Sequence, residues 1–328
     1  MSHAAWLPPL RHTESGADRR VGIELEFAGL AIEEISALVA GHVGGEREVI
    51  SDYEHRVHSE SHGDWHVEFD FAWLKQWGRE RGDAPAETID ELLERIVRSS
   101  AEPFVPMEVV TPPLPMLEIG ALDGLIAKLR DAGARGTRDG VTYAFGMHLN
   151  PEMPALDAAI ICCYLKAFLC LFDWIKEQAA VDLTRRLMPY IDPFPARYVR
   201  RVVDPDYWPE REALIDDYLA DNPTRNRALD LLPLFAHVDP ARVRRGVDDP
   251  RVKARPALHY RLPNCEIDRP DFSVVPAWRD WLQVEELVAD EDRLRRLCAA
   301  YTEFLASPLE RAFQSWAAEL SQWLSDDR

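Results

Sequence analysis

The stretch RVGIELEFAGL at residues 20–30 decides the fold, because apolar and polar residues alternate along it. This period of two predicts a β-strand with one buried face and one polar face. The expected buried side chains are Val21, Ile23, Leu25 and Phe27. On the other face, Glu24 and Glu26 lie two residues apart, so their carboxylates project to the same side with Cα atoms about 7 Å apart.

The same alternation returns later in the chain. Residues 64–71 (DWHVEFDF), 141–150 (VTYAFGMHLN) and 257–262 (ALHYRL) repeat it, and the last of these places His259 and Arg261 on one face. We therefore expect strands at 20–30, 64–71, 105–110, 141–150 and 257–268 in one mainly antiparallel, curved sheet. Glu24 and His148 should then lie on the same face of that sheet.

Helical periodicity separates these strands. Apolar residues follow helical spacing over 89–97 and 119–129, and Gly133 is a suitable stop for the second helix. The longest predicted helix covers 155–187, and residues 278–325 predict two or three more helices with breaks near Ala289 and Ser307. An α+β fold follows, with helices packed on the outer face of the sheet. We expect a loose arm at 1–19 and a single domain over 20–328.

Residues 189–256 differ from the rest of the chain because prolines and arginines crowd them. We expect a loop-rich segment there, and long ordered loops with charged side chains often carry function. For any one of these arginines, a place in a solvated irregular insertion without function is an equal alternative to a functional role.

Composition limits the possible partners. The 328 residues carry a formal net charge of −19, which disfavours nucleic acid and anionic membranes as partners because both present phosphates. Five cysteines without a C-x-x-C pair suit a reducing cytoplasm and no disulfide framework. The acidity itself fits either simple solubility or carboxylates that hold cations.

The polar face of the predicted strands favours cations. Carboxylates gathered on one face repel one another unless solvent or cations neutralise them. Magnesium is the natural candidate, since it prefers oxygen ligands and is shared with substrate phosphates. Taken singly, a Glu-x-Glu strand face is more often exposed to solvent, and a strand histidine such as His148 is more often structural. The hypothesis depends on recurrence across several strands.

The order of short motifs adds a resemblance. The motifs occur in the order GIELEF (22–27), FDFA (69–72), MEVVTPPL (107–114), GMHLN (146–150) and HYRLPNCEID (259–268). Together they resemble the carboxylate–amine ligases of the glutamine synthetase superfamily, and above all the bacterial putative amidoligase family. Glutamate–cysteine ligases are more distant relatives. The resemblance spans about residues 20–270 and implies a glutamine-synthetase-like sheet.

The resemblance also implies a set of site residues. The implied metal ligands are Glu24, Glu26, Glu108, His148 and Glu266, with Asp70 facing the metals as well. Arg261 would contact a phosphate or a substrate carboxylate. The residues predicted to bind the nucleotide are Arg225, Arg255, Arg261 and Asn264.

Three positions depart from the family pattern. Ala72 replaces a common Ser, Asn150 replaces a common His or Val, and Asp268 stands where an arginine is frequent. The last change leaves open which arginine holds the γ-phosphate; Arg225, Arg255 and Arg269 are candidates.

The expected activity is ATP-dependent joining of a carboxylate to an amine through an acyl phosphate, with Mg²⁺ or Mn²⁺ as the metal. Phosphoryl transfer needs cations on the β and γ oxygens and basic side chains for the developing charge. Asp70 or Glu68 is the expected base for the amine proton, and Glu68 could instead be a metal ligand. The expected substrates are a small amine and a carboxylate or peptide. The alternatives are a metal-dependent amide hydrolase and a catalytically silent amino-acid- or peptide-binding member of the fold.

Overall fold

The computed structural model describes residues 6–69, 106–137, 145–179, 192–307 and 315–326. Within them the chain forms an α+β fold around one open sheet with the strand order β2-β3-β4-β5-β1-β7-β9-β8, and the short strand β6 (Leu114–Pro115) pairs with β1. The long strands are β1 (Arg20–Phe27), β2 (Glu46–Ser51), β3 (Glu54–Ser59), β4 (Gly63–Phe69), β5 (Met107–Val110) and β7 (Met147–Pro151). Two short strands, β8 (Leu229–Asp230) and β9 (His259–Tyr260), complete it. The described strand pairs are antiparallel.

The described parts of the five predicted strands are confirmed as members of this one sheet, while residues 70–71, 105 and 141–144 of the predicted ranges lie outside the described residues. Strand β1 has its apolar residues fully buried and its glutamates half-buried, as the alternation predicts. The predicted strand at 257–268 is regular only at His259–Tyr260, and isolated bridges at Ala257 and Asn264 extend its pairing. Strands β2 and β3 were not predicted from the sequence. The predicted helix at 89–97 lies outside the described residues.

Helices cover the apolar face of the sheet. Helix α1 (Ile32–Val43) packs against β3 and β4, and α4 (Leu122–Ala132) packs beside α1. Helix α4 ends at Gly133, whose φ of 112° lies in the left-handed region that glycine adopts without strain. At the other end, Tyr260 of β9 packs against Phe168 of α5 (Ala158–Gln178) and Trp281 of α11 (Val275–Val288).

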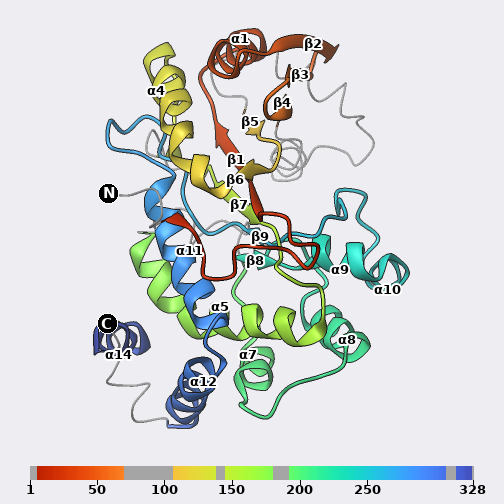
Figure 1. Ribbon diagram of the computed structural model, residues 1–328, viewed down its shortest axis with the longest axis vertical. Coiled ribbons are helices and arrows are strands. Elements are labelled where there is room, and N and C mark those ends of the chain that lie inside the picture. The colour runs from red at the N-terminus through yellow and green to blue at the C-terminus, as the bar shows by residue number, and fades with distance from the viewer. Residues whose placement is uncertain (1–5, 70–105, 138–144, 180–191, 308–314, 327–328) are drawn as a thin grey trace, which may run out of the picture.

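Helix α5 is the centre of the helical part (Figure 1). It contacts α7 (Ala196–Val203), α11, α12 (Glu291–Ala306) and α14 (Trp316–Asp326). Among the described helices it alone has the length and apolarity to cross a bilayer, but 67% of its apolar window is buried inside the protein. The burial identifies α5 as a core helix.

Two segments differ from the sequence prediction. The Pro- and Arg-rich segment 189–256, expected to be loop-rich, contains α7, α8 (Arg211–Asp221), α9 (Leu232–Val238) and α10 (Pro240–Gly246). Four of its prolines, Pro195, Pro209, Pro233 and Pro240, stand at or beside helix starts, where proline's fixed φ and missing N–H are tolerated. The described part of the N-terminal arm lies against the domain, since the Trp6 carbonyl accepts a 2.7 Å hydrogen bond from Trp278 Nε1.

A buried ion pair fixes the start of β1. Arg19 donates two hydrogen bonds to Glu285 of α11 at 2.8 and 2.9 Å, and both side chains are fully buried. Tyr164 and Trp281 also donate to the Glu285 carboxylate, at 2.5 and 2.9 Å. Because a buried charge needs complete pairing, this network ties β1 and its glutamates to the helical layer.

Candidate metal centre

Antiparallel register brings the predicted polar residues together at the middle of the sheet. Glu24 in β1 stands directly opposite His148 in β7, and Glu26 stands opposite Glu108 in β5. These four residues come from three adjacent strands, and all four project from the face opposite the apolar core. The expectation that Glu24 and His148 share one face is confirmed.

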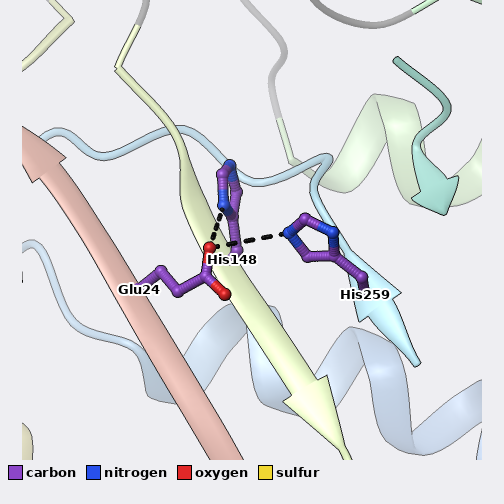
Figure 2. A group of neighbouring side chains, drawn as sticks. All are labelled: Glu24, His148 and His259. Carbon is purple, nitrogen blue, oxygen red and sulfur yellow. Dashed lines mark hydrogen bonds and ion pairs between the residues drawn. The ribbon is translucent and has the colours of Figure 1, made fainter. Parts of the chain in front are cut away.

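One candidate group consists of Glu24, His148 and His259 (Figure 2). Glu24 Oε2 lies 2.8 Å from His148 Nδ1 and 3.6 Å from His259 Nε2. The two imidazole rings meet edge to face, with their centroids 5.2 Å apart. Figure 2 shows the three side chains pointing toward one another from β1, β7 and β9.

A second candidate group consists of Glu26, Glu108 and His148. Glu26 Oε1 lies 3.4 Å from His148 Nε2, and Glu26 Oε2 accepts a 2.6 Å hydrogen bond from the Gly146 backbone N–H. In each group the possible ligand atoms lie within 4.8 Å of one another. Because His148 belongs to both groups, one imidazole separates two adjacent places for a cation.

Burial sets the charges of these side chains. Burial alone would raise the pKa of Glu24, but His259 and His148 outweigh it and hold that pKa well below its usual range. Burial lowers the pKa of His148 in spite of the two glutamates beside it. At neutral pH the group therefore presents a carboxylate and a neutral imidazole, the protonation states that metal ligands require.

A row of glutamates continues from the second group across the sheet. The row runs from Glu54 on β3 through Glu68 on β4 and Glu108 on β5 to Glu26 on β1, and each glutamate stands directly opposite the next. Like charges directly opposite on neighbouring strands are destabilising, which favours a bound cation in the row. Burial raises the pKa of Glu68, Glu54 adds to the rise, and Lys253 opposes it.

Arg255, from the segment before β9, approaches the same face, and Arg261 follows β9 directly. Arg255 Nη2 lies 3.6 Å from Glu24 Oε1 and donates a 2.7 Å hydrogen bond to Asn150 Oδ1. Arg261 donates to the Arg225 carbonyl, and burial together with the Arg261 charge lowers the pKa of Arg225. The Nε atoms of Arg225 and Arg255 are buried without a hydrogen-bond partner among the described residues. Guanidinium groups with an unused Nε–H donor suit an anion.

The predicted site residues divide into those that converge and those that do not. Glu24, Glu26, Glu108 and His148 converge, with Arg255 beside them. Asn264 forms a bridge with Gly146 near the second group. Glu266 belongs to neither group; its Oε2 accepts a 2.8 Å hydrogen bond from Arg269 Nη1, and it lines a cavity together with Asn264 and Arg269. Asp70 lies outside the described residues.

His259 was not among the predicted ligands. The sequence places it on the same strand face as Arg261, which was the available signal. What brings it to Glu24 is the pairing of β9 with β7 through Tyr260 and Leu149. A two-residue strand gives too short an alternation to predict that pairing.

Comparison with known proteins identifies the family of the chain. A scan against models of protein families matches residues 17–283 to the family described as putative amidoligase enzyme. Searches of curated proteins and of solved structures return no match. The matched range covers most of the chain and contains every residue of the two candidate groups, so the protein belongs to the putative amidoligase family, whose description is that of an amide-bond-forming enzyme.

Proposed function

We propose that the protein is an ATP-dependent carboxylate–amine ligase with a glutamine-synthetase-like catalytic sheet. The observation that carries the proposal is the position of His148 between two carboxylate-containing groups, with Arg255 beside the first of them. A ligase that activates a carboxylate with ATP needs cation ligands and guanidinium groups facing one space. The family assignment supports the amide-bond-forming part of the proposal.

The donor set fits divalent cations. Glu24, Glu26, Glu108 and His148 would hold them, and the opposed Glu26 and Glu108 carboxylates favour a neutralising charge between them. The cations of choice are Mg²⁺ or Mn²⁺, which when bound with ATP would neutralise charge on the transferring phosphoryl group. Glu266, paired with Arg269, is proposed as a ligand only if that pair opens.

The arginines are the proposed anion ligands. Arg225, Arg255 and Arg261 would hold the phosphates of ATP or a substrate carboxylate, with Asn264 beside them. Repulsion between Arg225 and Arg261 is relieved when an anion binds between them, since the charge of Arg261 already lowers the pKa of Arg225. No P-loop motif is present in the sequence, so these side chains would replace the Walker-type backbone cradle.

The reaction balances as two steps. A carboxylate oxygen of one substrate takes the γ-phosphoryl group and ADP leaves, which converts a poor leaving group into phosphate. The amine then attacks the acyl carbon, the C–O bond to phosphate breaks, and the new C–N bond forms with loss of one proton. Glu68 is suited to accept that proton because its raised pKa makes it a stronger base, and Asp70 is the alternative.

The proposed substrates are a small amine and a carboxylate or peptide, handled in the cytoplasm without nucleic acid or membrane partners. The net charge of −19 supports the exclusion of phosphate-rich partners.

The test is an ATP-consumption assay with pools of amines and carboxylates. The proposal expects ADP and phosphate in equal amounts, only when an amine, a carboxylate and Mg²⁺ or Mn²⁺ are all present, together with a new amide in the mass spectrum. Amide hydrolysis without ATP would instead identify a metal-dependent hydrolase. Ligand binding without turnover of ATP or amide would identify a silent member of the fold.

A further inference from the structure

The two candidate groups differ in chemistry. Glu26 and Glu108 offer carboxylate oxygens, whereas His148 and His259 together with Glu24 offer two nitrogens and one oxygen. Oxygen ligands suit Mg²⁺, while imidazole nitrogens suit first-row transition ions such as Zn²⁺ and Co²⁺. The nitrogen-rich group is therefore poorly matched to the ion expected for ATP.

His259 directs a buried ring nitrogen, Nε2, at Glu24. Its side chain is 3% exposed, and its Nε2 has no hydrogen-bond partner among the described residues. The opposite nitrogen, Nδ1, lies 3.4 Å from Asp230 Oδ2, and that carboxylate is fully buried and also accepts the Leu232 N–H at 2.9 Å. A buried carboxylate behind an imidazole is the usual support of a metal-binding histidine, because it fixes the ring and its tautomer.

Glu24 is held so that one oxygen remains directed at the imidazoles. Its Oε1 accepts a 2.9 Å hydrogen bond from Asn150 Nδ2 and faces Arg255 at 3.6 Å. Its Oε2 faces His148 Nδ1 at 2.8 Å and His259 Nε2 at 3.6 Å. Thus three ligand atoms from β1, β7 and β9 converge, and each side chain is supported from behind or from the side.

We propose that Glu24, His148 and His259 bind a transition-metal ion of the Zn²⁺ or Co²⁺ kind in preference to Mg²⁺. A neutral imidazole has one acceptor nitrogen, so His148 then serves this ion through Nδ1 and presents its Nε2–H to Glu26. The Mg²⁺ that accompanies ATP is then held by Glu26 and Glu108 and no longer by all four residues of the donor set, and this second assignment rests on the proposed function. The first does not require ATP.

The experiment is a Co²⁺ titration of the metal-free full-length protein without nucleotide. The expected result is visible d–d absorption that saturates at one equivalent, is lost on adding about one equivalent of Zn²⁺, and is unchanged by millimolar Mg²⁺. The proposal would be overturned if the folded protein showed no d–d absorption with Co²⁺. It would also be overturned if Mg²⁺ displaced Co²⁺ as readily as Zn²⁺ does.

Variants locate the ion. His259→Gln should abolish the saturable absorption, and Asp230→Asn should weaken Co²⁺ binding about 10- to 100-fold by loosening the ring. His66→Gln is the matched control: His66 lies on the same polar face, in line with Glu24 across β4, β5 and β1, and belongs to neither group. Equal Co²⁺ affinity in all three folded variants would also overturn the assignment.

Far-UV circular dichroism of each metal-free variant checks the fold, and Asp230→Asn keeps the test decisive if His259→Gln does not fold.

Failure of the ligase proposal looks different: Co²⁺ binds as expected, but no amine and carboxylate support ATP consumption. Ligation that depends on Mg²⁺ in a protein without the Co²⁺ spectrum would sink only this inference.

Discussion

Glu26→Gln separates a metal site from an ordinary polar strand face. The substitution keeps the size of the side chain and removes one negative charge from the second group. The Gln oxygen can still accept the Gly146 N–H, which Glu26 Oε2 accepts at 2.6 Å. The amide nitrogen then faces His148 Nε2, where Glu26 Oε1 lies at 3.4 Å. The Gly146 hydrogen bond is therefore preserved, whereas the amide nitrogen meets His148 donor to donor when that ring carries its proton on Nε2.

The expected effects on stability and on activity have opposite signs. Removing the charge ends the direct opposition of Glu26 and Glu108, which stabilises the metal-free protein by about 0.2–1 kcal/mol. Metal-mediated charge stabilisation contributes several kcal/mol to phosphoryl transfer. A loss of about 4 kcal/mol corresponds to a roughly thousandfold fall in phosphate release.

The assay compares Glu26→Gln with Glu33→Gln. Glu33 is exposed in the first turn of α1, away from both candidate groups, and its change should cost no more than about 1 kcal/mol through the helix dipole. Melting temperature, Mn²⁺ affinity and ATP-dependent phosphate release are measured side by side. Equal phosphate release and equal Mn²⁺ affinity in the two variants would refute the reasoning, because Glu26 would then be a solvent-facing side chain.

Three further predictions concern stability and anion binding. Glu285→Gln should cost about 3–5 kcal/mol in urea unfolding because it leaves a buried arginine without its full charge partner, whereas Glu291→Gln in an exposed pair should change less than about 1 kcal/mol. Burial raises the pKa of Asp280 to about 6, so ionisation of this carboxyl destabilises the folded state as pH rises toward 6. Asp280→Asn should therefore raise the free energy of unfolding by about 1–2 kcal/mol above that pH, after allowance for partial exposure. Near pH 4 the substitution should not change the free energy of unfolding measured by thermal unfolding. Arg255→Gln should weaken nucleotide binding about tenfold to a hundredfold in calorimetry, while Arg251→Gln, whose arginine is paired with a nearby aspartate, should have no comparable effect.

The sequence predicts the centre of the sheet better than its edges. In β1, every buried position is apolar and both glutamates occupy half-buried positions between them, so the alternation is complete. In β3, the buried positions are His55, Val57 and Ser59, two of them polar, and the pattern disappears. Every residue of β2 is exposed, so no apolar face marks that strand.

Four residues of the candidate site were predictable from strand alternation and from the order of the motifs. Glu24 and Glu26 follow from period two, and Glu108 and His148 follow from the motif order. His259 depends on the long-range pairing of β7 with β9, and two-residue strands carry too little pattern to reveal it. Arg255 was predicted to bind the nucleotide, but its position beside Glu24 was not predicted. The helices of segment 189–256 were missed because proline was interpreted as a helix breaker and not as a helix start.

The topology also explains how one face can hold both acidic and basic groups. The glutamates belong to β1, β3, β4 and β5, in the first third of the chain. The arginines flank β8 and β9 in the chain, with Arg225 before β8 and Arg255 before β9, and the pairing of β9 with β7 brings Arg255 beside β1. Glu24 is the place where the two sets meet, since it lies within 3.6 Å of both His259 and Arg255. A cation on Glu24 Oε2 would compete electrostatically with Arg255 for this carboxylate, and a weakened hold on Arg255 leaves its guanidinium more available to an anion. Cation and anion binding should therefore be positively coupled through Glu24, as an enzyme that binds a metal together with a nucleotide requires.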